Sequence, residues 1–367
     1  MASHDDAPAL LESRQRAPRI ASPHLIHGRG YTVLLIGLVV AVAATSITAI
    51  SIGAVPVPLG TVWAVIRDEV LSRRGRQDPG DIQIVWQIRT PRVLLALVAG
   101  AGLSVAGAVL QAVVRNPLAD PYILGAASGS SLGAVAIITL GSATIGGLGV
   151  SAAAFIGGVA ALALVFVLGQ RRGTFAPTRL VLAGVAVAYL ASAMTSFLQL
   201  RADPNALRAT LFWLLGSVAS ADWSDLGVPT FVVVTATVAL TVQRRRLNAL
   251  MIGDEAAASL GVNVNRLRVQ LMIWASLLTA SVIAVAGAIG FVGLVVPHVV
   301  RLLVGPDHRR VLPVSVLLGG IYLVLVDLAA RLAARPGELP IGIFTTALGA
   351  PFFLWLMRHR ERVAGVG

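Results

Sequence analysis

The chain contains no cysteine and no lysine, and all 29 of its basic residues are arginine. Without cysteine it can form no disulfide, no thiolate metal site and no cysteine nucleophile. Without lysine it lacks the P-loop residue that contacts nucleotide phosphates, which excludes a standard P-loop ATPase. Charged residues make up 13% of the chain, about half of the roughly 25% found in soluble domains. For the chain as a whole we expect no catalytic residue, no bound cofactor and no metal site.

Long apolar runs dominate what is present. Of 367 residues 56% are hydrophobic, and the mean hydropathy is +0.83. Since a helix needs about 20 apolar residues to cross a bilayer, the sequence predicts an all-α polytopic membrane protein with about ten transmembrane helices. The expected spans are 31–53, 91–114, 121–141, 145–169, 178–201, 226–243, 268–290, a short one near 292–304, 309–334 and 341–358. The positive net charge lies in loops between these spans, which favours a membrane setting and no nucleic-acid partner.

The two ends of the chain differ in character. Residues 1–30 are polar and of mixed charge, which predicts a disordered tail, and residues 31–360 form one transmembrane domain. The apolar run after the tail is too long for a signal-peptide core, so we expect an uncleaved first span. His4, His24 and His27 in the tail suggest metal binding, but scattered histidines in tails are usually solvated.

A polar segment, residues 243–268, interrupts the apolar pattern between two spans. We expect it to lie in water as two short helices separated by Gly253. Glu255-Ala256-Ala257 precedes Gly261, which stops the second helix, and the small alanines allow close approach by another protein. The alternative is an ordinary cytoplasmic loop.

Arginine bias gives the orientation. With the N-terminus inside, the inner segments hold 19 arginines and the outer segments 10. Because inner loops carry the excess of basic residues, both termini and the polar segment are expected to be cytoplasmic.

A short internal echo suggests duplication. Val105–Val109 in the second expected span recurs as Val285–Ile289 in the seventh. The two spans run in opposite directions, so the halves are expected to be inverted repeats. In a chain this rich in alanine and glycine, chance is the alternative.

Several longer motifs follow one another in a specific order. They are Val85-Trp86-Gln87-Ile88-Arg89-Thr90-Pro91-Arg92, Arg115-Asn116-Pro117-Leu118-Ala119-Asp120-Pro121, Gly290-Phe291-Val292-Gly293-Leu294-Val295-Val296-Pro297-His298, Gly305-Pro306-Asp307-His308-Arg309-Arg310, Glu338-Leu339-Pro340-Ile341-Gly342 and Leu348-Gly349-Ala350-Pro351. With the polar segment, they give the chain a clear resemblance to the FecCD/BtuC-type permeases of bacterial ABC importers, which take up iron–siderophores, haem and cobalamin.

The resemblance implies a type II ABC importer permease fold in the bacterial cytoplasmic membrane. It also implies a homodimer, two separate ATPase subunits that bind ATP and Mg, and one extracytoplasmic binding protein. The expected ATPase-coupling residues lie in residues 243–268, as cytoplasmic coupling helices. They are Gly253, Asp254, Glu255, Ala256, Ala257 and Gly261.

Three arginines near outer span ends are expected to dock the binding protein. In the resembled family, arginines at the positions of Arg89, Arg92 and Arg331 hold glutamates of that partner, as bidentate pairs. The alternatives are snorkelling to lipid phosphates and, for Arg331, an ion pair with Asp327 four residues earlier.

The resemblance places a cytoplasmic gate at Asn116 and Leu118, with a second contribution at Thr178. Asn-Pro also starts plain turns, and Pro177 stands where relatives have Ser or Thr, which weakens the second assignment. Gln111 nearby suits either the pathway or a helix–helix hydrogen bond.

Two alternative functions rest on one or two residues each. Asp327, an acid inside a span, could couple an ion in a secondary transporter. Ser128 with His298 as its base could form a membrane protease site. In place of these two functions we expect an importer whose cargo is an iron–siderophore, with haem or cobalamin as the alternatives.

Overall fold

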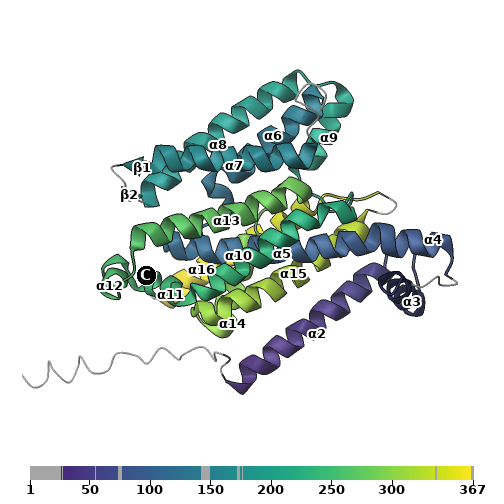
Figure 1. Cartoon of the computed structure of the whole chain (residues 1–367), viewed down its shortest axis with the longest axis horizontal. Helices are drawn as coiled ribbons and strands as arrows, with labels where there is room; N and C mark the ends of the chain where they lie inside the picture. The colour runs from purple at the N-terminus through teal and green to yellow at the C-terminus, as the bar shows by residue number, and fades with distance from the viewer. Residues whose placement is uncertain are drawn as a thin grey trace, which may run out of the picture.

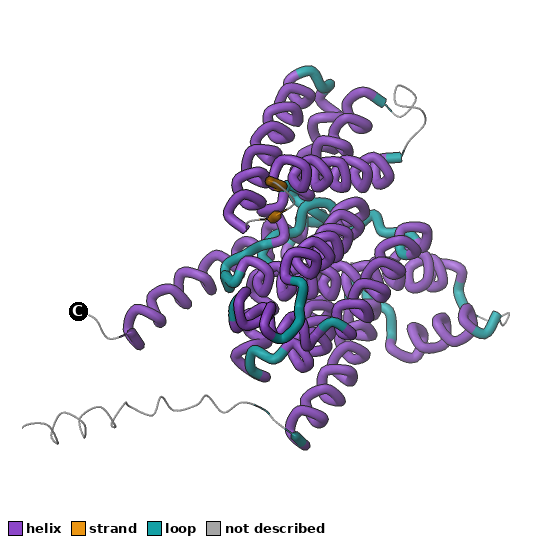
Figure 2. The backbone as a smooth tube through the Cα atoms, turned by 60° about the vertical axis from the view of Figure 1, so that its left-hand side comes forward, coloured by secondary structure: helices purple, strands orange, loops and turns teal. Residues whose placement is uncertain are grey.

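The structure, a computed structural model, describes residues 26, 28–53, 55–72, 77–141, 149–171, 174–175, 177–334 and 337–364. Within these residues the chain is helical apart from turns and two short strands (Figure 2). Nearly all of the predicted tail, including His4, His24 and His27, lies outside the described residues. The first described helix, α2 (Arg29–Ser51), begins close to the predicted start of the first span.

The remaining elements follow in chain order. They are α3 (Leu59–Val70), α4 (Pro79–Ile82), the π-helix η1 (Gln83–Arg89), α5 (Thr90–Val114), the 3-10 turn η2 (Pro121–Leu124), α6 (Ala126–Leu140), α7 (Val150–Gly169), β1 (Gln170–Arg171), β2 (Thr174–Phe175), α8 (Pro177–Leu200), α9 (Pro204–Leu214), η4 (Trp223–Asp225), α10 (Gly227–Val242), α11 (Arg244–Ile252), α12 (Asp254–Ser259), α13 (Val264–Ala286), α14 (Val292–Val304), α15 (His308–Ala333) and α16 (Ile341–Ala364). Strands β1 and β2 pair antiparallel, with Gln170 opposite Phe175.

The helices match the predicted spans. In the described part of the chain seven helical segments are long and apolar enough to cross a membrane, and three shorter apolar helices accompany them. The shorter ones are Ala126–Leu140, Val292–Val304 and Ile341–Trp355, which coincide with the third, eighth and tenth expected spans. The all-α, multi-span fold is therefore confirmed.

Helix α5 is the centre of the bundle. Its side chains are buried along nearly its whole length, and it packs against α13, α14 and α15. Figure 1 shows α6, α7 and α8 as a separate layer above α13, with α2 on the opposite side of the bundle. Large apolar side chains of α2 and α8 face outward, such as Val33 and Tyr189 at 69% and 76% exposure. Such surfaces suit lipid or another membrane helix.

Small residues bring α5 into direct backbone contact with its neighbours. A Cβ on Gly107 would lie 1.8 Å from the carbonyl oxygen of Gly293 in α14. A Cβ on Gly100 would lie 2.1 Å from the carbonyl oxygen of Gly319 in α15. Neither position can carry a side chain without displacing backbone. The glycines of the second span therefore act as the close-packing residues that membrane helices use.

Two ends of the bundle carry different short elements. Figure 1 places α11 and α12 at one end, and α3, α4 and α9 at the other. Helix α9 is capped by the Asp203 carboxylate, which accepts two backbone N–H groups. Trp223 stacks on Trp86 with ring centroids 4.6 Å apart and donates its indole N–H to the Trp86 carbonyl.

The five-residue echo occupies two different local settings. Val105–Val109 lies inside α5, whereas Val285–Ile289 runs across the end of α13, where Gly287 has a φ of 67°. The inverted relation of the two halves stays a prediction.

Candidate functional site

The polar segment forms two short helices between α10 and α13, as predicted. Gly253 separates α11 from α12 with a φ of 143° that non-glycine residues rarely adopt. Gly261, with a φ of 78°, follows the end of α12. Glu255 is exposed, Ala256 is half-buried and Ala257 is fully buried against the bundle. One face of α12 is thus anchored and the other is open.

The open face also carries large apolar side chains. Ile252 and Leu260, at the two ends of α12, are 73% and 67% exposed. Exposed apolar residues beside an exposed acid form a small amphipathic surface of the kind that protein partners bind.

Helix α11 is attached to the start of α15. The Asn248 amide donates to the Asp307 carboxylate at 2.6 Å, and the Asn248 oxygen accepts the backbone N–H of His308 at 3.0 Å. The pKa of Asp307 lies below its usual range. Partial burial raises this pKa, but hydrogen bonds from the Arg309 N–H and from Asn248, together with the charge of Arg310, outweigh the effect of burial. Asp307 is therefore an ionised cap that joins two elements.

Helix α12 is attached through Asp254. Its carboxylate lies 3.0 Å from the guanidinium of Arg115, at the end of α5, and 2.8 Å from that of Arg268 in α13. Neither arginine was assigned a role from the sequence. Arg115 stands directly before the Asn-Pro turn, and this position is the sequence feature that could have marked Arg115 as a candidate.

The predicted gate residues Asn116 and Leu118 form an exposed turn after α5. The Asn116 side chain accepts the backbone N–H of Leu118 at 2.9 Å, which fixes the turn. Thr178 is exposed in the first turn of α8, and α8 packs against η2, which follows the gate turn. Gln111 donates to the Gly293 carbonyl at 3.2 Å and accepts from Arg301, so it makes the helix–helix hydrogen bond.

The three predicted docking arginines lie together at the opposite end, but all are buried, at 4 to 7% exposure. Arg92 makes a bidentate contact with Asp327 and donates to Glu338 at 2.8 and 2.9 Å. Arg331 pairs with Asp327 at 3.1 Å, so the predicted pair four residues apart is present. Each arginine is thus engaged by groups of its own chain.

Arg89 is held differently. Its guanidinium donates to the backbone carbonyls of Ile50, Ser51 and Val55, in and after the end of α2. A Cβ on Gly53 would lie 2.2 Å from this guanidinium, so the loop can wrap it only with glycine there. None of these partners could be read from the sequence, because backbone carbonyls leave no residue-type signal.

The protease pair is not supported by its surroundings. Ser128 lines a pocket of about 330 Å³ between α6 and α8, whose walls include Ser192, Ser196 and Gln199 but not His298. His298 lies in α14, with its ring 6.2 Å from that of Phe352. Among the described residues no group of His, Asp and Glu side chains could hold a metal ion.

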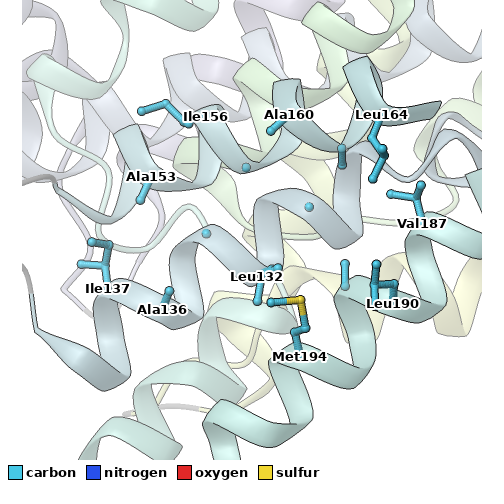
Figure 3. A pocket seen from close by; sticks show the side chains of 15 residues that line it. Leu132, Ala136, Ile137, Ala153, Ile156, Ala160, Leu164, Val187, Leu190 and Met194 are labelled. Atoms are coloured by element: carbon cyan, nitrogen blue, oxygen red, sulfur yellow. The ribbon is translucent and has the colours of Figure 1, made fainter. Parts of the chain in front are cut away.

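A second groove, of about 410 Å³, runs between α6, α7 and α8 (Figure 3). Its walls are almost wholly apolar, with Leu132, Ile156, Leu164, Leu190 and Met194 among the side chains pointing into it. It offers no polar group for a charged cargo or for catalysis, and it suits a bilayer-facing surface.

The geometry defines a class of protein: a multi-pass helical protein whose long apolar helices can span a membrane, with two short polar helices, α11 and α12, at one end. Comparison with known proteins agrees. Residues 33–359 match the FecCD transport family. A cobalamin import permease, BtuC of Halobacterium salinarum, is 46% identical over 76% of this chain and 74% of its own length. A hemin transport permease, HmuU of Yersinia pestis, is 36% identical over 93% of this chain and all of its own length.

A solved structure has the same fold. It is described as an inward-facing metal-chelate type ABC transporter, is 33% identical, covers 89% of this chain and 99% of its own, and has a TM-score of 0.78. The chain belongs to the FecCD family. It is a permease subunit of an ABC importer, and this integral membrane subunit corresponds to the non-catalytic half of such transporters.

Proposed function

We propose that this permease translocates an iron–siderophore across the cytoplasmic membrane by alternating access. Two separate ATPase subunits, which bind ATP and Mg, supply the energy. A second copy of the chain completes the pathway as a homodimer. A binding protein delivers the cargo from outside, and both termini face the cytoplasm.

One observation carries this proposal: helix α12 lies at one end of the bundle with one face open. Asp254 and Ala257 hold α12 to the bundle, while Glu255 and Leu260 are exposed. An ATPase that binds Gly253, Asp254, Glu255, Ala256, Ala257 and Gly261 would push on a segment tied directly to α5, α13 and α15.

The test reverses the charge of the exposed acid. We expect Glu255→Arg to fold normally and to cut ATP-driven uptake about tenfold or more, because a buried interfacial charge mismatch costs several kcal/mol. Uptake and co-purification of the ATPase subunits are measured in proteoliposomes. Glu69→Arg makes the same reversal on exposed α3 at the opposite end and should transport normally. Normal uptake by Glu255→Arg would remove the coupling assignment.

The identity of the cargo is a more specific proposal than the class of transporter. The relatives named above are named for cobalamin and hemin, and the solved structure for metal chelates, so a bulky metal chelate is the shared class. The hydroxyl-lined pocket between α6 and α8 offers many weak contacts rather than one charged site. Cobalamin is the second candidate because the relative named for it is 46% identical.

Cargo is decided by offering the assembled importer, with its binding protein, a ferric siderophore, haem and cyanocobalamin separately. Uptake of labelled iron from the siderophore alone is expected. Uptake of cyanocobalamin alone would replace the iron–siderophore proposal by the cobalamin one and leave the importer mechanism intact.

Docking of the binding protein is proposed at the end that holds Arg89, Arg92 and Arg331. Glu338 is the most accessible member of this network, with 43% of its side chain exposed. A partner carboxylate could reach Arg92 by replacing Glu338. At the cytoplasmic end the proposed gate is Asn116 and Leu118, with Thr178 facing the same mouth.

The secondary-transporter alternative has less support. A coupling acid must bind and release an ion, but Asp327 is fully buried between the guanidinium groups of Arg92 and Arg331. Its ion pairs with these two arginines, at 2.9 and 3.1 Å, are contacts within the same chain, as in a structural charge network.

A further inference from the structure

Asp254, the first residue of α12, contacts two membrane helices at once. Arg268 of α13 is buried and reaches both carboxylate oxygens, at 2.8 and 2.9 Å. Arg115 of the α5 terminus is more accessible, with 39% of its side chain exposed, and lies 3.0 Å from the same carboxylate. The first residue of the exposed helix is therefore directly bonded to the end of the central helix.

Arg115 immediately precedes the gate turn, which hydrogen bonds of its own residues stabilise. Its own backbone is left-handed, with φ 52° and ψ 37°, a region that few non-glycine residues adopt. The Asn116 N–H donates to the Gln111 carbonyl, and the Ala119 N–H donates to the Asn116 carbonyl. The Asn116 side chain also accepts the Leu118 N–H, so hydrogen bonds hold residues 116–119 as one turn at the end of α5, directly after Arg115.

Helices α11 and α12 have separate attachments. The joint between them is Gly253, whose φ of 143° is open to glycine, and a Cβ there would lie 3.8 Å from the Arg115 guanidinium. Helix α11 is bonded to the start of α15 by the Asn248–Asp307 hydrogen bond. A displacement of α12 would therefore act on Asp254 and its partners Arg115 and Arg268 before it acts on the contact between α11 and α15.

We propose that Asp254 is a positioning residue that transmits movement of α12 to the gate turn, residues 116–119, through Arg115. The inference rests on the proposed ATPase coupling and gate. Side-chain exposures of 39% and 42% make the Asp254–Arg115 pair a surface ion pair, which contributes little to stability. It can break and re-form during each transport cycle, and its removal by replacing Arg115 should leave the permease folded.

The test uses the absence of cysteine in this chain. Leu118→Cys places a single thiol on the gate turn of the permease, and the full complex with its ATPase subunits is reconstituted in proteoliposomes. The rate at which a maleimide modifies this thiol is measured with and without MgATP and vanadate. ATP hydrolysis is measured on the same preparation. We expect nucleotide to change the labelling rate about tenfold, the size of a typical coupling between sites.

Adding Arg115→Gln should abolish the nucleotide-dependent change at position 118 while ATP hydrolysis stays within about twofold of the parent, since only the link between them is cut. Asp254→Asn should also abolish this change, and Asp254→Glu, which keeps the charge, should retain the response. Arg67→Gln, which breaks an ion pair of 2.8 Å in α3, is the matched control and should behave as the parent.

Two results would overturn the inference. One is an Asp254→Asn complex that responds fully to nucleotide at position 118. The other is an Arg115→Gln complex that loses its ATPase subunits, since Arg115 would then serve attachment instead. Failure of the proposed function is recognised separately, in the parent complex: there either no ATPase subunit binds or position 118 does not respond before Asp254 is changed.

Discussion

Asp327 decides the charge balance at the end of the bundle opposite α11 and α12. It is fully buried and meets Arg92 at 2.9 Å and Arg331 at 3.1 Å. Replacing both members of a buried ion pair with apolar residues is often tolerated. Removing one member is costly, because the other charge stays buried without compensation.

We expect Asp327→Asn to destabilise the detergent-solubilised permease by about 3 to 5 kcal/mol, since two buried arginines lose their shared partner while side-chain volume is kept. The midpoint of thermal unfolding, followed by tryptophan fluorescence, measures this. Arg67→Gln, at an exposed pair, should shift the midpoint little. An unchanged midpoint for Asp327→Asn would mean that water reaches the network.

The contacts of single residues are also the features that the sequence predicted least well. The pair Asp327–Arg331 was predictable because its members are one helical turn apart. The contact between Arg92 and Asp327 was not, since it joins residues 235 positions apart. Arg89 binds backbone carbonyls, which every residue carries. Outward position predicted the three arginines as a group, but their burial depends on helix packing that charge bias does not describe.

At the scale of elements, hydropathy and the positions of glycine predicted most of the helices and their boundaries. Ten apolar segments and the break at Gly253 were predicted. Helices α3 and α4 and the π-helix η1 were not, because α3 is too short and amphipathic to count as a span. The π-turn precedes Pro91, whose ring prevents a regular preceding turn, and Thr90 donates its hydroxyl to the Val85 carbonyl there.

The crossing of α5 with α14 gives an element-scale prediction. We expect Gly107→Ala to destabilise the permease by about 1 to 3 kcal/mol, because the new methyl meets the Gly293 carbonyl and the helices must separate. Thermal unfolding in detergent is compared with that of Gly37→Ala in α2, where a Cβ meets nothing within 4 Å. Equal midpoints for the two variants would contradict close packing at this crossing.

At the scale of the whole molecule, the two ends of the bundle are expected to face different compartments. Arginine bias places α12 inside and α9 outside. Because the chain has no cysteine, single thiols can report each end: Ser259→Cys on α12 and Ala209→Cys on α9 are both at exposed positions.

A membrane-impermeant maleimide added to intact spheroplasts should label Ala209→Cys at once and Ser259→Cys only after permeabilisation. The labelled fraction is read on the purified permease. The cysteine-free parent chain is the control for background labelling. The reverse pattern would invert the orientation and with it the side from which an ATPase could bind.

The two arginines at the start of the second span also differ in when their partners are synthesised. Arg89 binds carbonyls of residues 50–55, which leave the ribosome before it. Arg92 needs Asp327, and at about 5 to 20 residues per second the ribosome takes about 10 to 50 s to add the intervening 235 residues. During synthesis the carbonyl partners of Arg89 are therefore already present when it is made, whereas Arg92 gains its buried partner only once α15 has been made.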